Sequence, residues 1–388
     1  MDPADALDRI VYLLDRALEP SQRVKAFVRA RDVVRAEGPE EIARRHRAGT
    51  LTDLPGIGPK TAAIIGEALA GGVPEYVTVL EEDTVIPPGP GAELRAALRG
   101  DCHTHSTWSD GGATIEEMAK AAIGLGHDYL VLTDHSPRLT VAHGLSAERL
   151  RRQLDEVAAL NERLAPFRIL TGIEVDILAD GSLDQSEELL AQLDVVVASV
   201  HSKLGMERTE MTRRMVNAVA SPHVDILGHC TGRKVAAWER FPGGVATGRR
   251  SAEPIPESER SAEPQRPRRG GRGSRSGAGR QWSTPTAGGG RAAATFDAEV
   301  VFAACAQFGT ALEMNCRPER QDPPDDLLAL ALDWDLEISI DTDAHAAGQL
   351  EFQAYGCDKA ARHGIEPERI VNTRSADDLV AWAAAHAE

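Results

Sequence analysis

The sequence predicts an α/β barrel preceded by a small all-α region, and three observations support this fold class. Seven short runs rich in β-branched residues follow residue 100, and helical patterns separate most of them. Before residue 84, the apolar residues recur at helical spacing instead. With 388 residues, of which 42% are hydrophobic, the chain is long enough for two or three domains with buried cores.

The first part of the chain has the pattern of short helices joined by turns. Apolar residues recur three and four positions apart, as do Ile10 and Leu14, and glycines interrupt the pattern at intervals. Prolines and glycines then crowd residues 87–91, which is typical of a linker. We therefore predict a helical domain over residues 1–85 and a linker over residues 86–99.

Seven apolar runs after residue 100 are predicted to be strands of one parallel sheet. Helical patterns such as Ser146–Leu164 lie between most of them. Repeated strand–helix units favour an α/β architecture, and seven such strands favour closure into a barrel over an open sheet. We place this barrel at residues 100–388. The predicted strands lie around Cys102–His105, Tyr129–Thr133, Ile169–Val175, Val195–Val200, Val224–Leu227, Thr310–Met314 and Glu337–Ile340.

One segment of the barrel region, at about residues 242–294, matches neither pattern. Gly, Ser, Pro and Arg dominate it, and its hydrophobic side chains are too few to offset the entropy of ordering the chain. We predict a disordered insertion between the fifth strand and a helix near Phe296–Phe308. Its ten arginines against four glutamates fit either a solvated insertion or an accessory tether for nucleic acid.

The chain is acidic overall, with 60 acidic and 43 basic residues and a formal net charge of −17. Taken alone, this balance argues against a nucleic-acid-binding protein, which is usually basic. The charge is uneven, however, because residues 22–60 hold nine basic residues against five acidic ones. The sequence therefore indicates a basic helical block joined to an acidic barrel.

Cysteine usage and hydropathy predict a cytoplasmic protein. The five cysteines are an odd number without a C-x-x-C pair, which argues against a disulfide scaffold. The first twenty residues lack the features of a signal peptide, and no run of about 18 uncharged apolar residues occurs. We therefore expect no association with a membrane, and the sequence leaves the oligomeric state open.

Histidines and carboxylates recur where the predicted strands end. The first strand carries His103 and His105, which lie two residues apart and hence on one face of the strand. Because the carboxyl ends of parallel barrel strands converge on one rim, we expect the side chains at these ends to meet in one cavity. The candidate metal ligands are His103, His105, Asp110, His135, Glu174, His201, His229, Asp343 and His345.

This ligand set predicts a cluster of two or three divalent ions. Mixed imidazole and carboxylate ligands suit Zn²⁺, Mn²⁺ or Fe²⁺, and nine ligands are too many for one ion. A carboxylate such as Glu174 would then bridge two ions. A single histidine at a strand end is more often structural, but recurrence at strand after strand favours ligation. We interpret Asp134, Asp176 and Asp341 as partners that orient ligands, and the other histidines as surface or helix residues.

Such a cluster predicts metal-assisted hydrolysis of phosphoesters. Basic residues after the fourth, fifth and sixth strands would hold the remaining phosphates, although a surface ion pair is an equally good interpretation of each. The candidate phosphate-binding residues are Lys203, Arg233, Arg317 and Arg320. The candidate catalytic residues are Glu174, Asp343, His201 and Arg233.

These residues stand in motifs that resemble the polymerase and histidinol phosphatase (PHP) domain. The motifs are GDCHTHSTWSDG at 100–111, TDHS at 133–136, GIEVDI at 172–177, SVHS at 199–202, GHCTGR at 228–233, NCRPER at 315–320 and DTDAH at 341–345. The resemblance implies a distorted seven-stranded barrel with up to three metals held by the nine candidate ligands. Two positions depart from the family pattern: Asp110 stands where other members carry His, and Cys230 where relatives often have Pro.

In the helical domain, residues 51–62 (LTDLPGIGPKTA) resemble a helix-hairpin-helix motif. The resemblance implies that the turn formed by Gly56, Ile57 and Gly58 brings backbone N–H groups close to a DNA phosphate, with Lys60 adding charge. Such contacts hold the DNA backbone without reading bases. A plain glycine-rich turn between two helices is the alternative interpretation.

Together, the two resemblances point to bacterial family X DNA polymerases, which combine a helix-hairpin-helix domain, a polymerase core and a C-terminal PHP domain. Only about fifteen residues separate the two matching parts here, which leaves no room for the polymerase core. The leading hypothesis is a metal-dependent phosphoesterase at DNA ends, a 3′–5′ exonuclease or 3′-end-processing enzyme of DNA repair without polymerase activity. A small-molecule phosphatase of the histidinol-phosphatase type is the alternative. A DNA-binding scaffold with a vestigial metal site is the third hypothesis.

Overall fold

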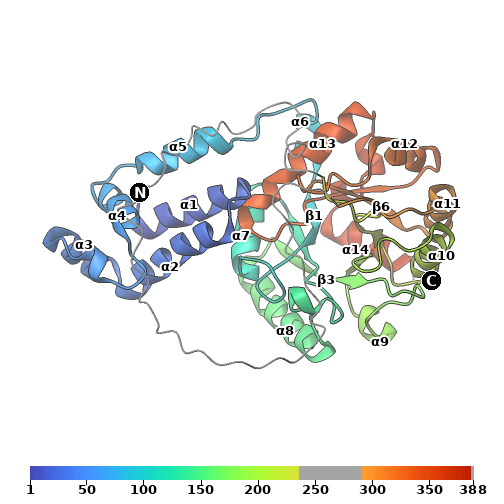
Figure 1. The fold of residues 1–388 in the computed structure, drawn as a ribbon, viewed down its shortest axis with the longest axis horizontal. Coiled ribbons are helices and arrows are strands. Elements are labelled where there is room, and N and C mark those ends of the chain that lie inside the picture. Colours follow the sequence, from blue (N-terminus) through green and yellow to red (C-terminus); the bar gives the residue numbers. More distant parts are fainter. Residues whose placement is uncertain (236–290, 386–388) are drawn as a thin grey trace, which may run out of the picture.

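A computed structural model describes residues 1–235 and 291–385, which form a helical part and a barrel part side by side (Figure 1). Residues 1–84 contain helices and turns, as predicted, and α1 is preceded by an N-cap aspartate, Asp2, whose side chain accepts from the N–H of Ala4. The helices of this part are α1 (Pro3–Arg16), α2 (Ser21–Glu37), α3 (Pro39–Ala48), η1 (Leu51–Asp53), α4 (Pro59–Leu69) and α5 (Glu75–Thr84).

These helices pack around a hydrophobic core of their own. Leu7, Ile10 and Leu14 are fully buried on one face of α1, where their spacing places them next to one another. Ile42 on α3 and Ile65 on α4 meet the same core and are also fully buried. The periodic apolar residues of the first 85 positions therefore form a hydrophobic core that is distinct from the clusters inside the barrel.

The second part is a barrel of seven parallel strands whose order in the sheet equals their order in the chain. Each predicted strand overlaps one observed strand, so the predicted fold class is confirmed. Almost every strand residue is buried, as expected for parallel strands that are covered on both faces. The strands are β1 (Gly100–Thr104), β2 (Tyr129–Leu132), β3 (Arg168–Asp176), β4 (Val195–Ser199), β5 (Ile226–Leu227), β6 (Ala311–Asn315) and β7 (Ile338–Asp341).

Polar side chains help to join β1 to β7, where the barrel closes. The backbone N–H of Cys102 donates to Asp341 Oδ1 at 2.8 Å, and the side-chain amide of Asn372 donates to the same oxygen at 2.8 Å. Past the end of β1, the N–H of His105 donates to the carbonyl of Ala344 at 2.8 Å. Asp341 is predicted to orient a metal ligand, and the structure shows its carboxylate accepting hydrogen bonds from Cys102 and Asn372 where the two strands meet.

Helices surround the barrel and connect its strands (Figure 1). A capping box formed by Thr114 and Glu117 starts α7, and the side chain of Ser146 caps α8. These helices are α6 (Ala92–Ala97), α7 (Ile115–Gly124), α8 (Ala147–Leu164), α9 (Glu187–Leu190), α10 (Arg208–Val219), α11 (Ala298–Phe308), α12 (Asp325–Asp333), α13 (Gln353–Arg362) and α14 (Ala376–Ala384).

The helical part is fixed to the barrel through α1 and the 3-10 helix η5 (Ala347–Phe352). Arg16 on α1 donates to both carboxylate oxygens of Glu351, at 2.8 and 2.9 Å, and the hydroxyl of Tyr12 donates to Glu351 at 2.7 Å. The backbones lie so close that a Cβ at Gly348 would stand 2.0 Å from the carbonyl oxygen of Tyr12. A side chain at position 348 would therefore separate the two parts.

The predicted linker contains a helix that belongs to the barrel. Within residues 86–99, α6 packs beside α13, and its Leu94 joins the hydrophobic core of the barrel. The linker interpretation therefore fits the Pro/Gly stretch at 87–91, whereas the residues of α6 that follow it belong to the barrel.

The predicted insertion lies mostly outside the described residues. The described chain resumes at Arg291, which pairs with Lys234 through two backbone hydrogen bonds of 2.7 and 3.0 Å. Ala294 is buried and donates its N–H to Thr231 at 2.8 Å. Residues 242–290 of the predicted insertion lie outside the described residues. At its predicted end, residues 291–293 are exposed and Ala294 is buried.

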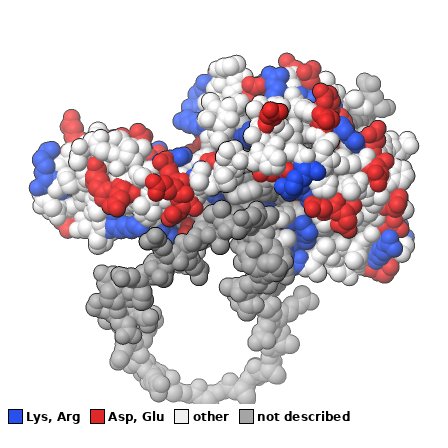
Figure 2. All heavy atoms as spheres, turned by 90° about the horizontal axis from the view of Figure 1, so that it is seen from above, with Lys and Arg blue, Asp and Glu red and all other residues white. Residues whose placement is uncertain are grey.

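The described surface carries charges of both signs. On the face that Figure 2 presents, Lys and Arg side chains lie interspersed with Asp and Glu over both the helical part and the barrel. None of the helices in the described ranges combines the length and apolarity that a membrane-spanning helix needs.

Candidate metal centre

The nine candidate ligands meet at the carboxyl ends of the strands. Eight of them form three overlapping groups, and within each group the potential ligand atoms lie no more than 4.8 Å apart. The ninth, His229, lies beside these groups, with its Nε2 2.8 Å from Glu174 Oε1. The groups are His105, Asp110, His135 and His345; His103, His105 and Asp343; and His135, Glu174 and His201.

Glu174 occupies the middle of the cluster. Its Oε2 lies 2.7 Å from His135 Nδ1 and 3.4 Å from His103 Nε2. Its Oε1 lies 2.8 Å from His229 Nε2 and 3.2 Å from His201 Nε2. One buried carboxylate from β3 therefore faces four imidazoles at 3.4 Å or less, with His105 at 3.7 Å as a fifth. This arrangement is suited to a bridging ligand.

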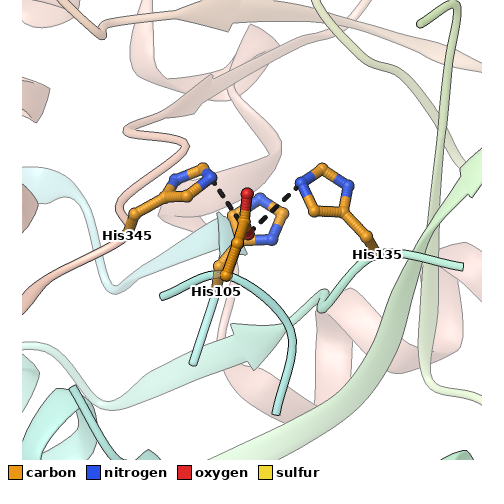
Figure 3. Close-up of side chains that lie close together, drawn as sticks. His105, His135 and His345 are labelled. Atoms are coloured by element: carbon orange, nitrogen blue, oxygen red, sulfur yellow. Dashed lines mark ion pairs between the residues drawn. The ribbon is translucent and has the colours of Figure 1, made fainter. Parts of the chain in front are cut away.

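The first group lies at the open side of the cluster. Figure 3 shows the rings of His105, His135 and His345 converging, and the ring centroid of His105 lies 4.4 Å from that of His135 and 4.2 Å from that of His345. Asp110 Oδ1 lies 3.5 Å from His135 Nε2 and 3.4 Å from His345 Nε2. The Asp110 side chain is 32% exposed, so this group faces solvent more than the other two.

The ring nitrogens of the cluster are suited to a metal. Both nitrogens of His105, both of His201 and Nε2 of His103 are buried and have no hydrogen-bond partner. A buried polar atom left unpaired costs about 1–3 kcal/mol. Divalent cations would satisfy these nitrogens and the ionised carboxylates between them, so the residues fit a metal cluster.

A comparison with known protein families identifies the first part of this barrel. Residues 101–231, which hold the strand ends of β1 to β5, match the PHP domain. The chain contains a PHP domain.

The chain is also similar to two curated proteins and, more weakly, to a solved structure. The chain is 34% identical over 285 residues to a Bacillus subtilis protein named DNA polymerase/3′-5′ exonuclease PolX, covering 74% of this chain and 41% of that protein. It is 36% identical over 137 residues to a probable phosphatase of Thermoanaerobacter sp., covering 33% of this chain and 52% of the phosphatase. A solved structure of a Listeria monocytogenes putative histidinol phosphatase has a TM-score of 0.40 and 15% identity over 65% of this chain and 97% of that one. The chain thus spans less than half of the Bacillus subtilis protein and about half of the phosphatase.

The barrel contains a further buried carboxylate beside the candidate ligands, Glu313 on β6, that the sequence analysis missed. Its Oε1 lies 2.6 Å from His103 Nδ1, and its other oxygen accepts from the backbone N–H of His229. Asn315, two residues on, donates to Asp343 Oδ2 at 3.2 Å. Polar residues at positions i and i+2 of an otherwise apolar strand are the signal that would have found this pair.

Burial and neighbouring charges place several ligands in the protonation state that binds a metal. Burial raises the pKa of Glu174, but the neighbouring histidines outweigh this effect and hold the pKa well below 4.5. Burial and two further histidines lower the pKa of His105 well below 6.5. Burial and Arg320 lower the pKa of His229 to about 3. Ionised carboxylates and neutral imidazoles are the forms that coordinate metals.

Two other ligands are shifted the opposite way. Burial lowers the pKa of His103, but Glu313 and Glu174 outweigh it and raise the pKa well above 6.5. Burial likewise lowers the pKa of His201, whereas Glu174 and Asp176 raise it, to about 9 in total. Without a metal these two rings hold protons that a bound cation would displace.

Two of the four basic candidates reach the cluster. Arg320 Nε donates to Asp343 Oδ2 at 2.9 Å, and its side chain is only 11% exposed. Arg317 Nη1 donates to the carbonyl of Asp343 at 2.8 Å and lies 2.8 Å from His345 Nδ1. Both arginines therefore contact candidate ligands directly.

The other two basic candidates lie differently. Arg233 directs its guanidinium to backbone carbonyls, donating to Arg320 at 3.0 Å and also to Gln321, so it holds the loop that carries Arg320. Lys203 is exposed, and no described contact joins it to the cluster. The structure thus places Arg233 as a support and Lys203 outside the immediate site.

Of the residues predicted to orient ligands, Asp176 contacts a candidate ligand and Asp134 contacts other residues. One of the remaining histidines also lies in other surroundings than predicted. Asp176 Oδ1 accepts from the N–H of His201 at 3.2 Å, as expected of a residue that orients a ligand. Asp134 instead binds Ser106 and other residues of the loop after β1. His127, predicted to be a surface or helix residue, is buried beside Arg95, whose Nη2 lies 2.9 Å from His127 Nε2.

The predicted DNA-binding turn lies between η1 and α4. Gly56 is exposed and has a φ of +100°, which a residue with a side chain rarely adopts. Ile57 is 4% exposed and packs into the helical core, and the N–H of Gly58 donates to Thr61 Oγ1 at 2.9 Å. Lys60 is exposed in the first turn of α4.

Proposed function

We propose that this protein is a metal-dependent phosphoesterase that hydrolyses phosphoester bonds at DNA ends, in 3′–5′ exonuclease or 3′-end-processing reactions of DNA repair. The single observation that supports the chemistry most strongly is the position of Glu174 among four imidazoles inside a PHP domain. The DNA substrate is supported by the similarity to the Bacillus subtilis protein, which covers 74% of this chain and so extends well beyond the residues matched by the domain.

The proposed metals are two or three divalent ions, Zn²⁺, Mn²⁺ or Fe²⁺, held by the three groups of ligands. When bound, such ions neutralise phosphoryl oxygens and activate a water nucleophile. Glu174 positions the ligand rings on both of its sides. Asp343 contacts His105 at 3.3 Å from one oxygen and Arg320 at 2.9 Å from the other, so it joins the ligands to the basic residues.

Arg320 and Arg317 are the proposed phosphate-binding residues. Burial lowers the pKa of Arg320, but Asp343 and the other nearby carboxylates outweigh it and raise the pKa, so the guanidinium stays charged. Its Nη1 is buried without a hydrogen-bond partner beside the cluster, where a phosphoryl oxygen would accept from it. Arg233 is proposed to act through Arg320 by holding its loop, and Lys203 to contact substrate only beyond the centre.

The helical part is proposed to hold the DNA backbone through Gly56, Gly58 and the first turn of α4. The Gly58 N–H is already donated within the turn, so the free N–H groups at the start of α4 are the better phosphate donors. Lys60 lies with its Nζ 3.5 Å from the ring centroid of Tyr76, which keeps its charge beside this helix end. These contacts would not distinguish sequences.

A small-molecule phosphatase of the histidinol-phosphatase type remains the second candidate function. The similarity to probable phosphatases favours it, since those proteins match a third of this chain. On this alternative the helical part would stabilise the barrel and would not bind substrate. The contact between Arg16 and Glu351 is consistent with such a role.

Turnover measurements separate the two candidates. The protein is purified without metal, loaded with Mn²⁺ or Zn²⁺, and assayed on 3′-labelled DNA, 3′-phosphorylated DNA and histidinol phosphate. We expect hydrolysis of a DNA substrate, loss of this activity in Glu174→Gln, and no incorporation of nucleotides into a primer. Activity on histidinol phosphate alone would contradict the DNA assignment, and full activity in Glu174→Gln would contradict the site.

DNA binding is tested with point variants, because deleting the helical part would expose the surface of η5 that contacts α1. Lys60→Met should weaken binding of duplex DNA and flatten its dependence on salt. Lys120→Met, which removes the same charge from an exposed position on α7, is the matched control. Equal behaviour of the two variants would contradict the proposed role of the turn.

A further inference from the structure

Four basic side chains gather at one side of the metal centre, and two of them were not among the candidate phosphate-binding residues. Lys234 follows the supporting residue Arg233, and Arg291 lies opposite Lys234 in a short antiparallel bridge. The other two are Arg317 and Arg320, which contact the candidate ligands directly.

Backbone hydrogen bonds hold this group in place. The two bonds between Lys234 and Arg291 measure 2.7 and 3.0 Å. The guanidinium of Arg291 donates from Nε to the carbonyl of Gly232 at 2.9 Å. On the other side, the N–H of Val235 donates to the carbonyl of Glu319 at 2.8 Å, next to Arg320. The segment with Lys234 is therefore tied to the loop that carries Arg317 and Arg320.

The charges in this group repel one another. Although Lys234 is exposed at the surface, partial desolvation by the surrounding protein lowers the pKa of its ammonium, and the charges of Arg320, Arg291 and Arg317 lower it further, with Glu319 as the opposing charge. Glu319 is already paired with Arg317, whose Nε lies 3.3 Å from its Oε2. Arg320 is likewise paired with Asp343 at 2.9 Å. Within the described ranges no acidic side chain forms an ion pair with Lys234, so a bound anion would relieve the repulsion that its ammonium meets.

The group extends beyond what one phosphate needs. Arg320 reaches the cluster itself, where its unpaired Nη1 would contact the phosphate that is hydrolysed. Lys234, by contrast, is exposed at the rim, so its ammonium is accessible to a group that lies outside the centre.

We propose that Lys234, together with Arg317, forms a second anion subsite that holds the phosphate next to the one that Arg320 contacts at the metal centre. This inference rests on the proposed function and specifies its substrate class: a DNA strand, which carries adjacent phosphates, and not a phosphate monoester, which carries one. Arg291 supports the subsite through its bridge to Lys234. The subsite would make the enzyme favour a polynucleotide over any small molecule with a single phosphate.

The first test measures binding, independently of turnover. Binding of a short single-stranded oligonucleotide to the metal-loaded protein is followed by fluorescence anisotropy over a range of salt concentrations. Lys234→Met should reduce the slope of log K against log salt by about 0.7, as expected for the loss of one phosphate contact to a single strand. Lys120→Met should leave the slope unchanged. An unchanged slope in Lys234→Met, or no binding by the wild-type protein, overturns the subsite.

The second test separates this subsite from the phosphoesterase activity itself. Lys234→Met should raise KM for the oligonucleotide about 5- to 10-fold without changing kcat, and should leave both parameters unchanged for p-nitrophenyl phosphate. Equal effects on the two substrates would overturn the subsite while leaving the phosphoesterase intact. If the wild-type protein hydrolyses neither substrate, the proposed function fails, and the salt dependence of binding alone then decides whether the subsite exists.

Discussion

Glu313 Oε1 lies 2.6 Å from His103 Nδ1, and both side chains are completely buried. The contact joins β6 to β1 across 210 positions of the chain. It fixes the orientation of the imidazole, so that the second ring nitrogen of His103 faces Glu174 at 3.4 Å. A carboxylate behind a histidine ligand makes the ring a better donor to a metal and sets its tautomer.

Replacing Glu313 with Gln is expected to weaken metal binding about 10- to 100-fold, because the amide removes the charge behind His103 but retains the size of the side chain. Metal affinity is measured by competition with a chelating dye. Glu299→Gln, on the exposed face of α11, is the matched control. Equal affinities in the two variants would show that Glu313 does not tune the ligand.

Removing the metals is expected to lower the thermal stability of the protein. Without metal, the buried ring nitrogens of His105 and His201 have no hydrogen-bond partner, whereas a bound cation would satisfy them. At a metal concentration 100 times the dissociation constant, the stabilisation is about 2.7 kcal/mol per site. Rebinding should release protons, since the pKa of His201 is raised to about 9 without metal. Melting curves with and without chelator measure the change in stability, and calorimetry in two buffers of different ionisation enthalpy measures the proton release. A melting temperature that does not change when chelator is added would contradict the assignment of the metal centre.

The contact between α1 and η5 is expected to contribute to the stability of the whole chain. Arg16 and Glu351 have side chains that are 6% and 21% exposed, so Arg16→Ala leaves a largely buried carboxylate unpaired and should cost about 3 kcal/mol. Arg9→Ala breaks an exposed pair with Glu81 and should cost less than about 1 kcal/mol. Chemical denaturation measures both variants, and similar losses would contradict the importance of the Arg16 contact.

His127 is expected to make stability depend on pH in the acidic range. Burial and the charge of Arg95 lower its pKa from 6.5 to about 3 in the folded protein. The unfolded chain takes up a proton near pH 6.5, so the stability from the neutral ring is complete above that pH and is lost as the pH falls toward 3. Between pH 7.5 and 5.0, the wild type should lose about 2 kcal/mol more than His127→Gln. Parallel pH profiles of the two proteins would exclude this role.

The sequence by itself determined the strands and the candidate ligands, because both depend on local pattern. A strand covered on both faces, such as Val195–Ser199, has to be a continuous apolar run, and helices between such strands make them parallel. Parallel strands in a barrel bring their carboxyl ends to one rim. The sequence therefore predicts that His103, Glu174 and His201 meet, and the structure brings them together.

Only the tertiary structure decided which residues support those ligands. Glu313 and Asp341 are both acidic residues on buried strands, yet one contacts His103 and the other ties Cys102 to the opposite edge of the barrel. His127 is buried because Arg95, from the segment predicted to be a linker, lies against it. These outcomes depend on which distant segment packs against each side chain, and no local periodicity of the sequence encodes such a neighbour.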